Sequence, residues 1–320
     1  MENQVIELKH AEKWKDTLNK CIRCGYCYEH CPLIKYTRWE SDAPRAKLIM
    51  IYGMLSGNLE PSKYIGEKLF SCFYCKRCEA ACSAGVPVTD VFADVRKDFV
   101  GTEFEAVGTT AVTGENCVLC LACVRACPHE ARLVEDGVVV TDMVKCESCG
   151  ICVDVCPNKC ITIENAYGTD SESLNKEIKE FLNKEKSKAI VFGCNWSFYP
   201  GLQTAEISGC ELCESEPSEE EYKILINLCG GRLSKPQLIE PLLNGAWGVL
   251  VACCPDGECE HDGNLKAKAQ VKILRDLFKE MEINPDRIQL VQIAHGDKTG
   301  FQAAIDEFMG KINELGPLNA

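Results

Sequence analysis

The chain has 320 residues and a formal net charge of −13, which argues against nucleic acid or an anionic membrane surface as a partner. An apolar share of 46% is enough for two or three globular domains. No segment approaches the roughly 18 consecutive apolar residues of a spanning helix, and the acidic start does not fit a signal peptide. We therefore expect a cytoplasmic protein without a transmembrane segment.

The 24 cysteines are the most informative residues. Sixteen of them form four copies of the spacing C-x2-C-x2-C-x3-C, a pattern typical of iron–sulfur ligands. Three close ligands let one loop wrap a corner of a cubane cluster, while the fourth reaches elsewhere. We therefore predict four [4Fe-4S] clusters and an anaerobic or protected setting. The runs are Cys21, Cys24, Cys27 and Cys31; Cys72, Cys75, Cys78 and Cys82; Cys117, Cys120, Cys123 and Cys127; and Cys146, Cys149, Cys152 and Cys156.

A disulfide scaffold and a set of zinc sites are the alternatives for so many cysteines. Disulfide-rich domains are usually small and secreted, whereas this chain is long and is not expected to be exported. Three evenly spaced cysteines with a fourth close behind fit a cubane better than a zinc ion.

Residues 1–105 have helical patterning around the first two runs. Pro44 stands where a helix begins, and Gly57 stands where that helix ends. Thr89 and Asp90 are expected to cap a following helix, VFADVRKDFV. We predict a helical domain that holds two clusters.

This region resembles the helical two-cluster subunit of heterodisulfide reductase and the related iron–sulfur subunits of lactate and glycerol-3-phosphate dehydrogenases. The resemblance rests on CIRCGYCYEHCP, APRAK, CFYCKRCEAAC and AGVPVTDVFADVRKD. Ser83 departs from the family, which usually has proline there. The resemblance implies crossed ligand sets: Cys21, Cys24 and Cys27 with Cys82, and Cys72, Cys75 and Cys78 with Cys31.

Residues 110–168 contain the other two runs. Asp136 and Gly137, between β-forming stretches, predict a tight hairpin, and CITIEN predicts a further strand. Gly150 lets the backbone approach a cluster sulfur, whereas Cys160 is expected to be a core residue. The region resembles the small two-cluster bacterial ferredoxin over its whole length. In that family the fourth cysteine of each run binds the other cluster, which implies Cys117, Cys120 and Cys123 with Cys156, and Cys146, Cys149 and Cys152 with Cys127.

The last part of the chain has a different pattern. Residues 169–187 are charged at helical spacing and predict a solvated linker helix. Residues 188–320 alternate short apolar strands with helical stretches at 236–244, 264–281 and 297–315, which predicts a parallel sheet with crossover helices. The expected fold class is thus a multidomain α+β and α/β chain: a helical two-cluster domain, a β-hairpin ferredoxin domain and a parallel α/β domain.

Cysteines end several of these predicted strands. Cys194, Cys229 and the pair Cys253–Cys254 each close a different strand, and Cys259 lies on the loop that follows. Because the carboxyl ends of parallel strands line the crevice where ligands bind, we expect these thiols to converge. Four converging thiolates suit a metal or a small cluster.

Residues 188–317 resemble the delta subunit of methyl-viologen-reducing hydrogenase, through FGCNWSFY, LCGGRLSKPQLIEPLLNGAWGVLVACCPDGEC and DGNLKAKAQVKILRDLF. The resemblance implies one [2Fe-2S] cluster, for which we expect Cys194, Cys229, Cys254 and Cys259 as ligands. Ser197 stands where the family has a further cysteine. A domain kept only for docking is therefore the alternative.

Other residues with possible chemistry are expected to be structural or exposed. Cys210 and Cys213 lie in an acidic loop outside the family pattern and are expected to be inert, with a ligand pair or a redox dithiol as alternatives. Charges inside the runs tune cluster potential or are merely solvated. No nucleotide motif is present. The histidines of this group are His129, His261 and His295, and the cations are Lys76, Arg77 and Arg125.

These features predict an iron–sulfur electron-transfer protein without catalysis of its own. The resemblances imply that it is one component of a hetero-oligomeric oxidoreductase complex of the heterodisulfide-reductase type. Its expected partners are a hydrogenase or formate dehydrogenase, a flavoprotein, and a reductase or bifurcating flavin subunit. The alternative is an enzyme that reduces thiol or disulfide substrates with Cys253 or with Cys210 and Cys213.

Overall fold

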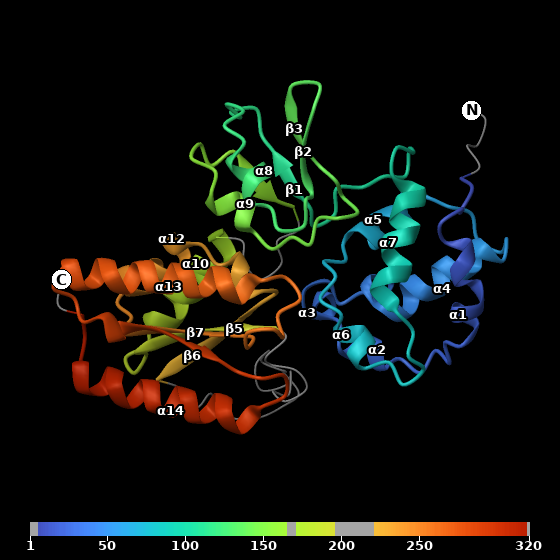
Figure 1. The fold of residues 1–320 in the computed structure, drawn as a ribbon. Coiled ribbons are helices and arrows are strands. Elements are labelled where there is room, and N and C mark those ends of the chain that lie inside the picture. Colours follow the sequence, from blue (N-terminus) through green and yellow to red (C-terminus); the bar gives the residue numbers. More distant parts are fainter. Residues whose placement is uncertain (1–5, 165–170, 196–220, 319–320) are drawn as a thin grey trace. The chain divides into compact units, whose positions relative to one another are not determined.

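The computed structural model describes residues 6–164, 171–195 and 221–318. The chain divides into two compact units, Met1–Ala166 and Tyr167–Ala320, each with a hydrophobic core of its own (Figure 1). Within the described ranges, every helix is too short or too polar to cross a bilayer.

The N-terminal part of the first unit is helical, as predicted. Pro44 is the first residue of α4, and Gly57 adopts a positive φ of 70° just after the helix ends. Helices α4, α5 and α7 pack around a core that includes Ile51, Leu69 and Phe92. The helices are η1 (Glu12–Trp14), α1 (Lys15–Asn19), α2 (Tyr26–Glu29), α3 (Pro32–Thr37), η2 (Glu40–Asp42), α4 (Pro44–Leu55), α5 (Lys63–Phe70), α6 (Arg77–Ala80) and α7 (Val88–Phe99).

The expected cap of α7 was wrong. The helix begins at Val88, its N-cap position is Pro87, and no side chain caps it. The hydroxyl of Thr89 instead donates a hydrogen bond of 2.5 Å to Oε1 of Glu79, which also accepts from the Thr89 backbone N–H at 2.6 Å. A tertiary partner on α6 thus replaces the local capping bond.

The rest of the first unit is built on short strands. Strands β2 (Arg132–Glu135) and β3 (Val138–Thr141) form the predicted antiparallel hairpin. Its two turn residues, Asp136 and Gly137, have φ values of 46° and 78°, as a type I′ turn requires. Strand β4 (Ile161–Ile163) pairs with β1 (Ala111–Thr113), and the helices here are α8 (Ala122–Ala126) and α9 (Ile151–Asp154).

The second unit has the predicted parallel sheet, with strand order β6-β5-β7-β8. Within this sheet, β5 comes first along the chain and lies between β6 and β7. The winding direction therefore reverses between β5 and β7. Ligand crevices in open parallel sheets lie at such a reversal, outside the carboxyl ends of the strands. The strands are β5 (Ala189–Cys194), β6 (Tyr222–Asn227), β7 (Gly248–Cys253) and β8 (Ile288–Gln292).

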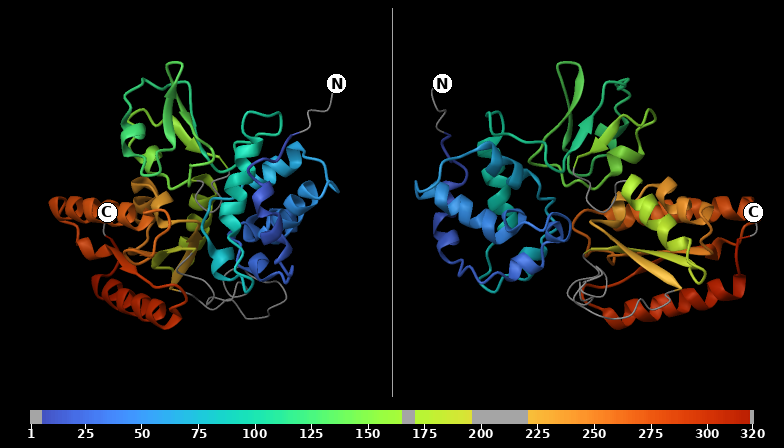
Figure 2. Two further views of the ribbon diagram at one scale, coloured as in Figure 1. Left: turned by 45° about the vertical axis from the view of Figure 1, so that its right-hand side comes forward. Right: turned by 180° about the vertical axis from the view of Figure 1, so that it is seen from behind.

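Helices cover both faces of this sheet (Figures 1 and 2). Ile190 and Phe192 of β5 face α10, α12 and α13, while Ala189 and Val191 face α14. This alternation follows from the period of two in a strand, and both faces are buried. The helices are α10 (Ser171–Leu182), η3 (Gly230–Arg232), α12 (Lys235–Leu243), α13 (Gly263–Glu280), η4 (Pro285–Arg287) and α14 (Lys298–Leu315).

Helix α10 corrects the expectation of a solvated linker helix. Leu174, Ile178 and Phe181 are only 5%, 0% and 4% exposed and belong to the core on the face of the sheet that α12 and α13 also cover. These residues recur at spacings of four and three, which places them on one face of the helix. The charged residues of the segment occupy the opposite face, so α10 is part of the second unit.

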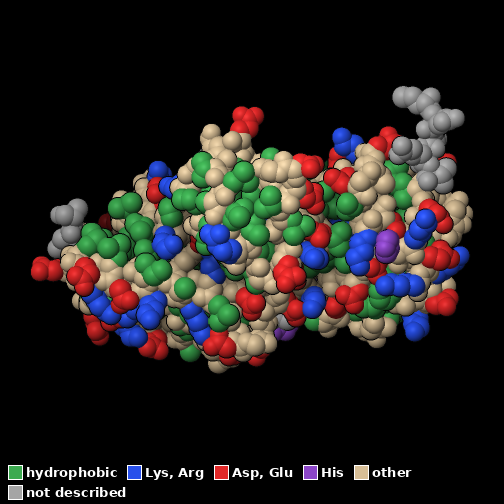
Figure 3. Space-filling model, turned by 45° about the horizontal axis from the view of Figure 1, so that its top comes forward, with side chains coloured by type: hydrophobic (Ala, Val, Ile, Leu, Met, Phe, Trp, Pro, Cys, Tyr) green, Lys and Arg blue, Asp and Glu red, His purple; other side chains and the backbone are tan. Residues whose placement is uncertain are grey.

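The surface carries charges of both signs. On the face in Figure 3, Lys and Arg side chains lie among Asp and Glu side chains. The negative excess of the chain is therefore not gathered into one acidic field on this face.

Candidate metal centres

The four cysteine runs share one backbone conformation. In each run, the residue before the second cysteine and the residue after it both have a positive φ between 53° and 91°. Left-handed residues of this kind turn backbone N–H groups toward a common point and form a concavity that suits an anion. A short helix then carries the third cysteine. The residues with positive φ are Arg23 and Gly25, Tyr74 and Lys76, Leu119 and Leu121, and Ser148 and Gly150.

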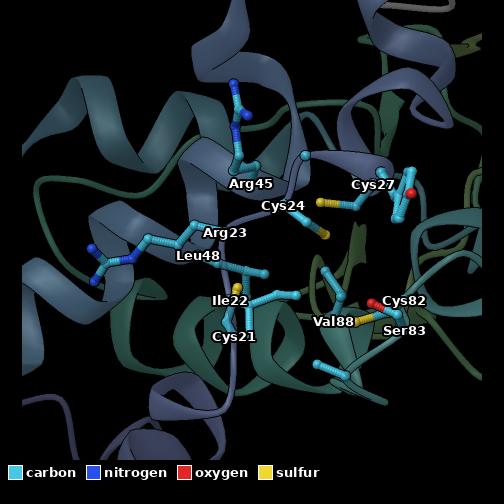
Figure 4. Close-up of a pocket in the computed structure, with 13 residues that line it drawn as sticks. Cys21, Ile22, Arg23, Cys24, Cys27, Arg45, Leu48, Cys82, Ser83 and Val88 are labelled. Atoms are coloured by element: carbon cyan, nitrogen blue, oxygen red, sulfur yellow. The ribbon is translucent and has the colours of Figure 1, made fainter.

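The first run faces a cavity together with the last cysteine of the second run. The sulfurs of Cys21, Cys24, Cys27 and Cys82 lie around this common space, while the side chain of Arg45 extends away from it (Figure 4). The backbone N–H of Val86 donates to the Cys82 sulfur at 3.4 Å.

The second run mirrors this arrangement. Its first three cysteines line a cavity together with Cys31, the last cysteine of the first run. The two runs therefore exchange their fourth cysteines, in the pattern that the resemblance implies. The lining cysteines are Cys31, Cys72, Cys75 and Cys78.

The third and fourth runs exchange their fourth cysteines in the same way, around two further cavities, of which the one at the third run is the smaller. Cys160 also lines the smaller cavity, and its sulfur lies 3.4 Å from that of Cys156. The two sets are Cys127, Cys146, Cys149 and Cys152, and Cys117, Cys120, Cys123 and Cys156.

Burial sets the protonation of these thiols. Burial, with neighbouring thiols, raises the pKa of Cys27 to about 11. Burial likewise raises the pKa of Cys75 and of Cys152 to about 12. These three sulfurs therefore keep their protons at neutral pH unless a metal replaces them, so metal binding at them releases protons.

The cavities fit a cluster of several metal atoms better than a zinc ion. Among the residues that the structure describes, no three His, Cys, Asp or Glu side chains are grouped as ligands of a metal ion. A zinc site would draw four sulfurs to about 2.3 Å from one point. The crossed sets instead surround a common space, with three cysteines from one run and the fourth from another, as the ligands of a cubane do.

A fifth group of thiols lies where the winding of the sheet reverses. Cys194 ends β5 and Cys254 follows β7, and their sulfurs are 3.6 Å apart. Cys229 contacts Cys194 and Cys259, and Cys254 contacts the same two thiols. The structure thus brings together all four cysteines predicted for this site, in a ring of neighbouring pairs.

The pKa values of these thiols depend on one another. Contacts with Cys194 and Cys259, together with burial, raise the pKa of Cys229 and of Cys254. Hydrogen bonds from Cys229 and Cys254 lower the pKa of Cys259. Cys259 is thus the thiol of this group whose thiolate form its neighbours stabilise.

Small residues make room for the thiols at the sheet edge. A Cβ on Gly263 would lie 2.4 Å from the Cys229 sulfur, so only glycine fits there. A Cβ on Gly230 would lie 3.3 Å from the Cβ of Cys253. Cys253 itself is 1% exposed, and burial raises its pKa to about 12.

The remaining predicted residues have varied positions. His129 lines the third cavity 3.5 Å from Glu147, and Arg125 donates to the backbone carbonyl of Cys120. His261 is 4% exposed. Ser197, Cys210 and Cys213 lie outside the described residues.

One charged residue that lines these centres could not be singled out from the sequence. Lys47 is 1% exposed and lines the cavity of the second run, and burial lowers its pKa. It shares the buried face of α4 with Pro44, Ile51 and Met54. A single lysine at the helical spacing of apolar residues was the available signal.

Matches to protein families agree with the division of the chain into two units. Residues 189–316 match the family described as methyl-viologen-reducing hydrogenase, delta subunit. Residues 17–86 and 109–157 each match a 4Fe-4S dicluster domain, and a further match of that description covers 71–132.

Individual relatives match different parts of the chain. An iron-sulfur subunit of the F420-non-reducing hydrogenase of Archaeoglobus profundus is 33% identical over 129 residues, which are 40% of this chain and 90% of that protein. One component of the ferredoxin:CoB-CoM heterodisulfide reductase of Methanosarcina mazei is 29% identical over 65% of this chain and 26% of its own length. The glycolate oxidase iron-sulfur subunit of Escherichia coli is 34% identical over 26% of this chain and 20% of its own length.

Proposed function

Because the chain belongs, through residues 189–316, to the family of the methyl-viologen-reducing hydrogenase delta subunit, we propose that it is an iron–sulfur electron-transfer subunit. It would work in an oxidoreductase complex of the hydrogenase or heterodisulfide reductase type, to which its relatives belong by name. The observation that carries this proposal is the set of four cavities, each lined by three cysteines of one run and one of another.

We infer that four [4Fe-4S] clusters occupy these cavities and that Cys194, Cys229, Cys254 and Cys259 hold a [2Fe-2S] cluster. When bound, such clusters take up and release single electrons. The pairwise contacts at the sheet edge suit two irons with two cysteine ligands each. The proposed modules are residues 1–105, 110–168 and 188–320, and α10 belongs to the core of the last.

The exposure of the cysteine runs supports an order in which electrons would pass through the clusters of the first unit. The second cysteines of the first and third runs, Cys24 and Cys120, are exposed, whereas Cys149 is buried. Ile22 and Val118, which follow the first cysteines of those two runs, are 70% and 65% exposed. The first and third runs would thus form the two ends of the path, open to a redox partner.

Hydrogen bonds link the second and fourth runs in the middle of this path. The Thr109 hydroxyl donates to the carbonyl of Cys72 at 3.4 Å, and the Ser148 hydroxyl donates to the carbonyl of Thr109 at 2.6 Å. Arg96 donates to the carbonyls of Leu69 and Met143 at 2.8 and 3.5 Å. These bonds hold the helical and hairpin parts of the first unit together, as electron transfer between them requires.

The alternative of a thiol- or disulfide-reducing enzyme gains no support at Cys253. A nucleophilic cysteine needs access to its substrate and a lowered pKa. Cys253 is 1% exposed, and its pKa is raised to about 12 by burial.

The proposal is tested on the full chain purified without oxygen. We expect reversible uptake of about four electrons by the cubanes and co-purification of a flavoprotein, a hydrogenase or a formate dehydrogenase. Rapid turnover of a small disulfide by the isolated chain, lost in Cys253→Ser, would contradict it.

A further inference from the structure

A lysine is buried at the cavity of the second run. The side chain of Lys47 is 1% exposed and lines the cavity shared by Cys31, Cys72, Cys75 and Cys78. Its Nζ donates to Oγ of Ser71 at 3.1 Å and lies 5.8 Å from the centre of the Phe92 ring. Both partners are neutral.

No carboxylate lies within ion-pair distance of Lys47 among the described residues. A buried ammonium without an anion is costly, since a hydroxyl and an aromatic face replace only part of its hydration. Lys47 also lines the cavity, beside the thiols of Cys31 and Cys72. An anion in that cavity would compensate the buried charge.

The carboxylates near this cavity pair directly with other groups, although the charge of Asp42 also acts on Lys47 and opposes the lowering of its pKa by burial. Asp42, whose backbone carbonyl lies 3.9 Å from the Cys31 sulfur, forms an ion pair of 2.9 Å with Lys68. Glu79 accepts two hydrogen bonds from Thr89. On the cationic side, His30 and Lys76 also line the cavity, and Arg77 is 7% exposed on α6.

We propose that Lys47 is the buried counter-charge of the cluster held by Cys31, Cys72, Cys75 and Cys78, and that it makes this cluster easier to reduce than its neighbour. The inference rests on the proposed function, because it presupposes a cluster in the cavity. Reduction adds one electron and one negative charge and breaks no bond to the protein. A nearby cation stabilises the added charge and raises the reduction potential.

The neighbouring cavity, lined by Cys21, Cys24, Cys27 and Cys82, lacks an equivalent charge. Its lining cations are Arg23 and Arg45. Arg45 forms an ion pair with Glu40, and Arg23 lies over the ring of Tyr52 at 5.5 Å. Both side chains extend away from the space between the sulfurs (Figure 4). The contrast predicts two different potentials in one helical scaffold.

The test is a redox titration of the full, anaerobically purified chain, followed by electron paramagnetic resonance. In Lys47→Met, one cubane should lose about tenfold in its equilibrium constant for reduction, a downward shift of about 59 mV for a one-electron couple. Lys47→Arg keeps the charge and should keep the higher potential. Lys63→Met removes an exposed charge on α5 and should leave all potentials unchanged.

Iron content separates the outcomes. Unchanged potentials in Lys47→Met, with all iron present, would overturn the role of Lys47 and leave the electron-transfer proposal standing. Loss of about four irons in Lys47→Met but not in Lys47→Arg would support the counter-charge. The same loss in both variants would overturn it. An unaltered chain without iron would instead defeat the proposed function itself.

Discussion

The two units gather cysteines in different ways. In the first unit, each cavity takes three cysteines from one short run whose backbone turns through two left-handed residues. In the second unit, the thiols come from the ends of separate strands and from a loop. The first unit uses its arrangement, three cysteines from one run and one from another, both on a helical scaffold and on a hairpin scaffold.

This difference shows what a cluster site depends on. A run that supplies three ligands carries its own geometry, so two unrelated scaffolds can present it. A site built from strand ends depends on the register of the sheet and on the room that residues such as Gly263 leave. Changes to the scaffold should therefore disturb the second unit's site more readily than the cavities of the first.

The largest expected effect tests the exchange of cysteines in the first unit. The double variant Cys21→Ser and Cys82→Ser should lose about four irons, because both residues line one cavity. The double variant Cys72→Ser and Cys82→Ser should lose about eight, because its residues line two cavities. Iron analysis of the anaerobic proteins measures both. The reverse order of losses would show that each run binds its own cluster.

A smaller effect is expected at the sheet edge. Cys194→Ser should remove about two irons and the signal of a binuclear cluster, with the cubane signals unchanged. The matched control is Cys253→Ser, next to the group but outside the proposed ligands, which should keep its full iron content. Equal losses in the two variants would mean that Cys253 is a ligand.

Gly263→Ala tests the dependence of that site on its scaffold. The new Cβ would lie 2.4 Å from the Cys229 sulfur and should displace the thiol. We expect partial loss of the binuclear signal and a destabilisation of about 1–3 kcal/mol. Gly310→Ala is the control, since its Cβ would have nothing within 4 Å. A Gly263→Ala protein with a full binuclear signal would show that the site of the second unit does not depend on its scaffold in the way we expect.

The smallest expected effect is a loss of fold stability at Asp94, a residue of the helical scaffold that lines none of the cavities. Asp94 is 8% exposed and contacts Lys13, Trp14 and Lys97 at 2.7 to 2.8 Å. Burial alone would raise its pKa, but the hydrogen bonds from these three partners outweigh that effect and lower the pKa from 3.8 to about 2. The carboxylate therefore stabilises the fold above pH 4, and this stabilisation disappears as the pH falls from about 4 to about 2.

Asp94→Asn should accordingly lower the free energy of unfolding by about 1–2 kcal/mol at pH 7, and equally at pH 5. Denaturant titration at the two pH values measures this. Asp276→Asn breaks the exposed pair with Lys279 and should cost less than about 0.5 kcal/mol. A loss at Asp94 that already shrinks between pH 7 and pH 5 would contradict the lowered pKa.

Local signals in the sequence were sufficient for much of the fold. The turn at Asp136 and Gly137 and the parallel sheet follow from patterns that tertiary contacts do not alter. The expected cap at Thr89 failed because Glu79, ten residues earlier, takes the hydroxyl. Helix α10 was misjudged because its many charges obscured the buried face of Leu174, Ile178 and Phe181.

The sequence predicted some features of the candidate sites and missed others. Spacing identified the four runs, and the ends of the strands identified the thiols of the second unit. Spacing alone did not give the exchange of fourth cysteines, which came from resemblance, because it depends on how two distant runs pack. Lys47 was missed because its position at the cavity depends on the packing of α4.

The most direct test of the central claim is the iron and acid-labile sulfide content of the full chain purified without oxygen, together with its paramagnetic resonance spectrum when reduced. Four crossed cubanes and one binuclear cluster predict about 18 irons per chain, of which about 16 belong to cubanes. Stoichiometric zinc, or a colourless protein with its cysteines paired as disulfides, would contradict the account.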